Sequence, residues 1–175
     1  MPRRNPLLIG MRLGGTLKEL VILIRDYEPG DSSAITVLFY ETVHSVNSKD
    51  YSGEQIRAWA TEVPDAGAWH SRMVRRCTLV AEEDGHVIAF AELERDGHLD
   101  MLYCRRDATG RGVGWHLYQA VEKRATVLGL KRIFAEASIT ARPFFERQGF
   151  ILRRQRTVTR GGVEMTNFAM EKQIT

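Results

Sequence analysis

The sequence predicts a single domain of the α/β (α+β) class, with a mixed, mostly antiparallel sheet and helices on both faces. The chain has 175 residues, which is long enough to bury one hydrophobic core. Two Asp-Gly pairs, at positions 84–85 and 96–97, separate three extended runs, and such pairs favour tight hairpin turns. One long helical pattern, over residues 113–128, lies between two extended runs, which is typical of a crossover between parallel strands.

The first part of the chain combines one extended pattern with three helical ones. β-branched residues predict a strand over residues 19–27. Apolar residues at helical spacing then predict a helix that is capped near position 31. After an irregular stretch over residues 44–51, the S-x-x-Q pattern that starts at Ser52 predicts a short second helix. A Pro-Asp pair at 64–65 begins a third helix.

The later part of the chain reads as strands placed around two further helices. Alternating apolar residues predict strands on either side of both hairpin turns, and a glycine follows each helical pattern as a stop. In chain order, the predicted elements are strands over residues 77–82, 87–94 and 98–104, a helix over 113–128, a strand over 131–137, a helix over 142–148, and strands over 150–159 and 163–173. The three strands before the long helix should form an antiparallel meander.

The N-terminus and the cysteines favour a cytoplasmic protein. Residues 1–19 are expected to be a loosely ordered N-terminal extension, and residues 20–175 the folded domain. Glycines interrupt the short apolar run after the first basic residues, and no small-residue cleavage site follows, so no secretory leader is expected. No apolar run is long enough to cross a bilayer. The two cysteines, Cys77 and Cys104, form no CxxC pair and no metal-ligand spacing, which favours free thiols and no metal site.

Composition argues against a nucleic-acid partner. The chain carries 25 basic and 22 acidic side chains, so its formal net charge is only +3. The basic residues are scattered, apart from a group near the end of the chain that comprises Arg153, Arg154, Arg156 and Arg160. Such a group on a strand is typical of a solvated face.

Three alternating glycines, Gly110, Gly112 and Gly114, connect the apolar run over residues 99–104 to the long helix. Such a turn exposes backbone N–H groups beside a helix N-terminus, where a phosphate or pyrophosphate binds well. A dinucleotide fold would need a third glycine in G-x-G-x-x-G, where Trp115 stands, and the G-K-[ST] ending of a P-loop is absent. The turn therefore indicates a phosphate site of another kind.

The segment LYCRRDATGRGVG, from Leu102 to Gly114, resembles the acyl-CoA-binding motif of the GNAT superfamily of N-acetyltransferases. That motif joins two apolar strand positions, here Leu102 and Cys104, to a turn with glycines at Gly112 and Gly114. Thr109 stands where the family has arginine or glutamine, so a side chain that often holds the turn is missing.

A second segment, SITARPFFERQGF, from Ser138 to Phe150, resembles the N-x-x-A-x-x-F-Y-x-x-x-G-F motif of the same family. The identical positions are Ala141, Phe144, Gly149 and Phe150. Ser138 replaces the asparagine. Phe145 replaces the tyrosine, and it has no proton to donate.

The resemblance implies a GNAT-like fold with a central, splayed pair of parallel strands. It implies an N-acetyltransferase that moves the acetyl group of acetyl-CoA to a primary amine by direct attack in a ternary complex, and it is compatible with a homodimer. The implied cofactor-binding residues are Leu102, Tyr103, Cys104, Thr109, Gly110, Arg111, Gly112, Val113, Gly114, Trp115, Ser138, Phe144 and Phe145. The departures at Thr109 and Phe145 keep a non-catalytic acyl-CoA-binding sensor module as the alternative function.

The strand before the glycine turn offers the catalytic candidates. Asp100 is the first candidate for the general base and His98 the second, because alternation along the strand places both on the face of Leu102. A carboxylate between apolar neighbours is costly unless it has a use or a partner. Tyr103 is a weaker candidate for the general acid, because the same alternation points it to the opposite face.

The acceptor amine, a small molecule or a peptide, is expected beside the first helices. His44, Asn47 and Tyr51 belong to the irregular stretch there, and Glu92 lies on the strand before the catalytic candidates. These residues do not identify the amine, because in this family the acceptor is chosen by variable loops.

Overall fold

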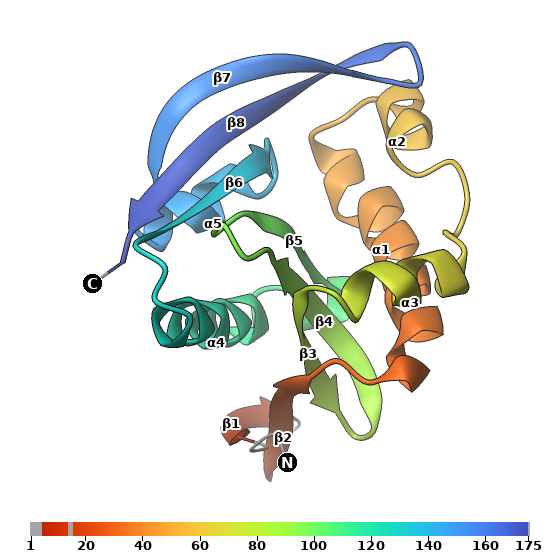
Figure 1. Cartoon of the computed structure of the whole chain (residues 1–175). Helices are drawn as coiled ribbons and strands as arrows, with labels where there is room; N and C mark the ends of the chain where they lie inside the picture. Colours follow the sequence, from red (N-terminus) through yellow and green to blue (C-terminus); the bar gives the residue numbers. More distant parts are fainter. Residues whose placement is uncertain (1–4, 14–15, 175) are drawn as a thin grey trace.

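The computed structural model describes residues 5–13 and 16–174, with side chains from residue 21 onward. Its strands form two antiparallel sheets (Figure 1). The larger sheet has the order β1-β2-β3-β4-β5, with β1 at Asn5–Leu13, β2 at Thr16–Asp26, β3 at Cys77–Glu83, β4 at His86–Leu93 and β5 at Leu99–Cys104. The smaller sheet has the order β6-β8-β7, with β6 at Arg132–Ser138, β7 at Ile151–Arg160 and β8 at Val163–Gln173.

Five α-helices are present in the described part of the chain, and their caps follow the sequence patterns. They are α1 at Ser32–Ser45, α2 at Gly53–Trp59, α3 at Ala66–Met73, α4 at Val113–Val127 and α5 at Arg142–Arg147. The capping box predicted at Ser52 is confirmed, since Ser52 and Gln55 each accept from the other's backbone N–H. Asp65 caps α3 by accepting from the Ala68 N–H at 2.7 Å. None of these helices combines the length and the apolar character that crossing a membrane requires.

Helices bury the two faces of the larger sheet. In β4, Ala89 and Ala91 belong to the core under α4, whereas Phe90 between them belongs to the core under α1. This alternation is the pattern of a strand buried on both faces. The helix residues that complete the two layers are Val113, Leu117, Val121 and Ala125 of α4, and Ile35, Leu38, Phe39 and Val43 of α1. The prediction of a mixed fold with helices on both faces is confirmed.

The two sheets meet at a contact that we call the sheet joint, formed by Gly97, His98, Arg132 and Phe134. The Phe134 N–H donates to the Gly97 carbonyl at 3.0 Å, and His98 forms one isolated parallel bridge with Phe134. Gly97 has a φ of +96°, and a Cβ added there would overlap the Arg132 carbonyl oxygen, so glycine alone fits. The expected parallel pair is thus reduced to one bridge, and β5 and β6 belong to different sheets.

The β7–β8 hairpin arches from the neighbourhood of α5 across to α2 (Figure 1). Near its tip, the Gln55 side chain donates to the Glu164 carbonyl at 2.9 Å, and the Tyr51 hydroxyl donates to the Thr166 carbonyl at 3.0 Å. These two bonds fix the tip against the helices that precede β3.

The N-terminal region differs from the expected loose extension. The backbone of Asn5–Leu13 pairs with β2 as an antiparallel hairpin, so the boundary expected at residue 20 falls inside β2. Residues 1–4, 14 and 15 of the expected extension lie outside the described residues. The glycine at position 10 interrupts the apolar run, but a glycine keeps the N–H and C=O groups that a strand ladder needs.

Gly97→Ala is expected to lower the free energy of unfolding by about 1–3 kcal/mol more than Gly85→Ala, because forced overlap in a packed site has this typical cost. Both glycines have a positive φ, +96° at Gly97 and +79° at Gly85, but a Cβ at Gly85 would meet open space. Urea denaturation followed by circular dichroism measures both variants. Equal losses would show that the sheet joint accepts a side chain.

Candidate active site

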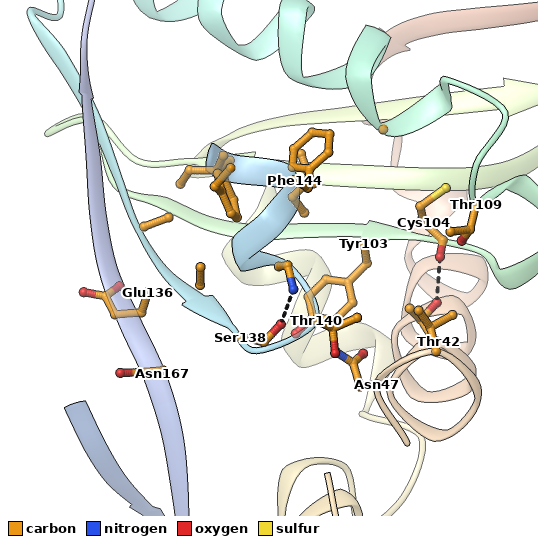
Figure 2. A pocket seen from close by; sticks show the side chains of 18 of the residues that line it. Thr42, Asn47, Tyr103, Cys104, Thr109, Glu136, Ser138, Thr140, Phe144 and Asn167 are labelled. Atoms are coloured by element: carbon orange, nitrogen blue, oxygen red, sulfur yellow. Dashed lines mark hydrogen bonds between the residues drawn. The ribbon is translucent and has the colours of Figure 1, made fainter. Parts of the chain in front are cut away.

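A cavity of about 860 Å³ opens between the two sheets (Figure 2). Residues of β5 and β6 line it on two sides. A third group, which we call the glycine wall, consists of Thr109, Gly110, Gly112, Gly114 and Trp115. A fourth group, which we call the aromatic wall, consists of Asn47, Tyr51, Trp59, Tyr103 and Arg160. The cavity therefore brings together segments from the first helices, the glycine turn and the β7–β8 hairpin.

The glycine wall has the backbone geometry of an anion site. Gly110 and Gly112 have φ values of +79° and +81°, and Gly112 is the N-cap of α4. The first N–H groups of a helix have no partner within the helix, and its dipole favours an anion there. At Gly114, an added Cβ would lie 3.7 Å from the Phe144 ring, so helix and ring are in close contact there. The predicted phosphate turn is thus placed at the cavity.

Two residues of the expected cofactor set do not line the cavity. The Arg111 guanidinium pairs with the Glu83 carboxylate of β3, with one contact at 3.2 Å. Val113 is fully buried in the core under α4. Arg111 precedes the helix and turns toward β3, whereas Val113 is the first residue of α4 and faces the core. A ligand at this turn would therefore meet backbone groups rather than the Arg111 guanidinium.

Leu102 and Cys104 line the cavity from β5 and pack against the core under α4. The Thr42 hydroxyl donates to the Cys104 carbonyl at 3.3 Å (Figure 2). Burial raises the pKa of the Cys104 thiol to about 11. The thiol is therefore protonated near neutral pH, which makes it a poor nucleophile.

The second motif also faces the cavity. Ser138, Phe144 and Phe145 are among the lining residues. The Ser138 hydroxyl accepts from the Ala141 N–H at 3.0 Å and so holds the turn into α5 (Figure 2). Phe145 is only 4% exposed and packs edge-on against Phe150, so the position that is tyrosine in the motif is an apolar packing position in this chain.

Asp100 lines the cavity and is held by an arginine. The register shifts between Glu92 and Leu93, which pair with Met101 and Leu99, so a β-bulge leaves Asp100 without a strand partner. The bulge therefore interrupts the simple alternation on which the expectation for Asp100 was based, although Asp100 and Leu102 both line the cavity. Asp100 is exposed, and its carboxylate forms an ion pair with the Arg76 guanidinium at 2.7 Å.

His98 lies at the sheet joint, and among the described residues it is not part of the cavity lining. Its ring stacks on Phe134, and its Nε2 lies 2.6 Å from a carboxylate oxygen of Glu136. Glu136 itself does line the cavity. The sequence analysis did not select Glu136. The signal that could have found it is alternation along β6, which places Glu136 on the same face as Ser138.

Tyr103 points to the face opposite Leu102, as alternation predicts, but that face also borders the cavity. Its ring stacks on Phe90 at a centroid distance of 5.6 Å and meets Phe39 edge-on at 5.0 Å. Burial raises the pKa of Tyr103 to about 12. The phenol is therefore neutral and rigidly held, and its hydroxyl keeps a proton at any physiological pH.

The structure separates the four residues expected to bind the acceptor. Asn47 and Tyr51 line the cavity. His44 does not, because its Nε2 lies 2.8 Å from the Ala60 carbonyl and its ring packs on Tyr40. Sequence spacing could not show this, because α1 turns the His44 side chain toward the chain that follows α2.

Glu92 is the fourth expected acceptor residue, and it is fully buried outside the cavity lining. It lies between Arg72, at 3.3 Å, and Arg76. Burial raises the pKa of Glu92, and the two arginine charges oppose that rise. A buried carboxylate is tolerated when it is paired, so Glu92 has a structural role here.

The Tyr51 hydroxyl forms two hydrogen bonds with the protein backbone and is not free in the cavity. It donates to the Thr166 carbonyl at 3.0 Å and accepts from the Ile139 N–H at 2.8 Å. Thr140, next in the chain, donates to Asp50 at 2.7 Å. The loop before α2 is thereby fastened to both β8 and the turn that follows β6.

The sequence analysis missed most of the lining that comes from the C-terminal hairpin. These residues are Val158, Thr159, Arg160, Met165, Thr166 and Asn167. They lie about a hundred positions from the first helices, and no local pattern indicates that the two regions meet. The arginine group near the end of the chain predicted a solvated strand face. It did not indicate that Arg160, among its members, borders a cavity.

Iodoacetamide is expected to modify Cys104 on the order of a hundred times more slowly in the folded protein than in urea at pH 8. The physical reason is that a pKa near 11, against an ordinary value near 9, leaves about a hundredfold less thiolate. A Cys77→Ser background leaves one thiol to follow by mass spectrometry. Equal rates in the folded and unfolded protein would contradict the expected protonation state.

Comparison with known proteins agrees with this geometry. Residues 47–172, more than half of the chain, match the family described as the acetyltransferase (GNAT) domain. The uncharacterized N-acetyltransferase YafP of Escherichia coli (strain K12) is 34% identical over 149 residues, which make up 85% of this chain and 94% of that protein.

Solved structures show the same fold. A GCN5-related N-acetyltransferase from Rhodopseudomonas palustris has a TM-score of 0.81 and 33% identity, over 86% of this chain and 94% of that one. The PaiA N-acetyltransferase from Thermoplasma acidophilum, in complex with coenzyme A, has a TM-score of 0.73 and 23% identity, over 87% of this chain and 98% of that one. The resemblance carried by the two sequence motifs is thereby confirmed, and the chain belongs to the GNAT family of acetyltransferases.

Proposed function

We propose that this protein transfers the acetyl group of acetyl-CoA to a primary amine by direct attack within a ternary complex. The observation that carries the proposal is the single cavity, whose lining includes both the glycine wall and the aromatic wall. A phosphorylated donor held at one wall can therefore meet an amine held at the other. The coenzyme A complex of the PaiA relative supports the choice of donor.

The glycine wall fits the diphosphate of coenzyme A. Gly110 and Gly112 border the cavity with positive φ and no Cβ, and α4 begins directly after them. A phosphate can therefore approach the backbone at the N-terminus of a helix. Leu102, Cys104 and Ser138 would hold the pantetheine arm between β5 and β6. When bound, acetyl-CoA supplies the acetyl group as an activated thioester.

Asp100 and Tyr103 each carry out one of the two proton transfers, Asp100 as the base and Tyr103 as the acid. The Asp100 carboxylate accepts the proton that the amine loses as its nitrogen forms the amide bond, directly or through one water. The Tyr103 hydroxyl donates its proton to the sulfur when the carbon–sulfur bond breaks. Its pKa of about 12 keeps that proton in place until it is needed. Tyr103 thereby takes the role that Phe145, without a hydroxyl, cannot take.

Direct attack is favoured over an acetylated enzyme. Cys104 is the cysteine that lines the cavity, and burial raises its pKa to about 11. Covalent catalysis requires the thiolate, which this environment disfavours. The amine therefore has no competing protein nucleophile at Cys104.

Asp100→Asn and Tyr103→Phe are each expected to lower kcat by about tenfold or more, because positioned acid and base groups commonly contribute about 10²–10⁴-fold. The dissociation constant of coenzyme A should stay unchanged in both. The assay measures thiol release from acetyl-CoA with a panel of primary amines. Tyr40→Phe is the matched control, because it removes a hydroxyl outside the described cavity lining and should keep full activity.

The same assay separates the proposal from its alternatives. Coenzyme A binding without turnover on any amine would favour the non-catalytic sensor. Parallel lines in double-reciprocal plots would indicate an acetylated enzyme and overturn the ternary complex. Unchanged kcat in Asp100→Asn and Tyr103→Phe would remove both residues from the mechanism.

Gly112→Asp is expected to weaken coenzyme A binding by about tenfold or more, because it adds bulk and a negative charge beside the diphosphate site. Gly85→Asp is the matched control, since Gly85 has a similar φ of +79° but lies in the β3–β4 turn. Isothermal titration calorimetry with coenzyme A compares the two variants. Equal affinity in both would show that the diphosphate does not bind at the glycine wall.

A further inference from the structure

Arg160 is the positively charged residue of the aromatic wall. It ends β7, and its guanidinium lies 5.8 Å from the ring centroid of Trp59, which also lines the cavity. The bonds from Gln55 to Glu164 and from Tyr51 to Thr166 fix the hairpin tip around it. The backbone of the hairpin that carries Arg160 is therefore held in place by the fold before any ligand binds.

The charge of Arg160 acts inside the cavity. Burial is the main cause that raises the pKa of both Tyr51 and Tyr103, and the positive charge of Arg160 opposes the rise at both hydroxyls. A negative charge at either place is therefore stabilised by Arg160. Asp100 acts in the opposite sense at Tyr103. The charges of Arg160 and Asp100 thus both act on the Tyr103 hydroxyl, in opposite directions.

Arg160 differs from Arg153 and Arg156 of β7 in that its charge is not paired with a carboxylate of the described residues. Arg153 pairs with Glu171 at 2.8 Å, and Arg156 pairs with Glu136 at 3.6 Å. Within the described residues, no carboxylate forms an ion pair with Arg160, and its contact is the face of Trp59. A guanidinium that rests on an aromatic ring keeps its N–H donors for a planar anion, which it can bind with two parallel hydrogen bonds.

We propose that the acceptor is an amine that also carries a carboxylate, and that Arg160 binds this carboxylate while the amino group faces Asp100. This inference rests on the proposed function. It narrows the substrate class to free amino acids and other small amines that carry a carboxylate. The cavity that Arg160 borders also has apolar lining from Val46, Val158 and Met165, which suits an apolar side chain on the acceptor. Arg160 is a specificity-determining residue in this scheme and takes no part in proton transfer.

The test compares each acid with its amide. Thiol release from acetyl-CoA is measured with L-leucine, L-methionine and L-phenylalanine, and with leucinamide, methioninamide and phenylalaninamide. The expected kcat/KM is at least about tenfold higher for the best acid than for its amide, as expected for one charge-assisted contact at an exposed site. The amide is the more easily deprotonated amine, so this preference cannot come from amine basicity.

Arg160→Gln is expected to remove the preference by lowering kcat/KM for the acid about tenfold while leaving the amide unchanged. Arg160→Lys should restore part of it, because lysine keeps the charge but loses the planar pair of donors. Arg154→Gln is the matched control, because Arg154 is an exposed arginine of the same strand that is not part of the described cavity lining. It should keep the acid preference.

Two outcomes would overturn the inference. In one, the parent protein acetylates acid and amide equally well. In the other, Arg160→Gln lowers the rates with acid and amide by the same factor, which would show that Arg160 only supports the position of Trp59. Calorimetry of coenzyme A-loaded protein with each acid and amide keeps the test independent of turnover. Acid-selective binding that Arg160→Gln abolishes, without acetylation of any amine, would support the carboxylate site and reject the proposed function.

Discussion

The sheet joint is the contact on which the rest of the site depends. At Gly97 the chain runs so close to the backbone of β6 that no side chain fits, and one parallel bridge follows at His98. Beyond it, β5 and β6 belong to different sheets and line a cavity on two sides. Because α4 follows β5 after a short turn, its N-terminus reaches the same cavity. The two sides of the cavity to which we assign the donor and the acceptor therefore both depend on one local constraint on the backbone.

A chain of ionisable groups crosses the sheet joint and holds the carboxylates that face the cavity. It runs through Glu136, His98, Glu94, Arg76 and Asp100, with the buried Glu92 as a branch on Arg76. A fully buried carboxylate such as Glu92 is costly without a partner, and Arg76 is one of its two arginine partners. The same guanidinium also holds Asp100. The arginine that pairs with the buried Glu92 thus also positions Asp100, which we propose as the general base.

Sequence patterns predicted the elements from β2 onward and the glycine turn, because these depend on neighbouring residues. The capping box at Ser52, the Asp-Gly hairpins and the helix after Gly112 all have the expected places. The patterns failed where a distant partner decides. The bulge at Asp100 shifts one side chain against the alternation, and Arg111 turns to Glu83 of β3.

The sequence by itself determined the family, the two motifs and the glycine turn, because each depends on residue types at fixed local spacing. Only the tertiary structure decided which side chains share the cavity. It removed His44 and Glu92 from the lining and brought in Glu136 and Arg160. The physical reason is that long-range contacts set each position. His44 is set by the packing of α1 against the chain after α2, and Glu92 by its pairing with Arg72 and Arg76. Glu136 and Arg160 are set by the pairing of β6, β7 and β8. Local sequence patterns do not show which distant segments of the chain come into contact.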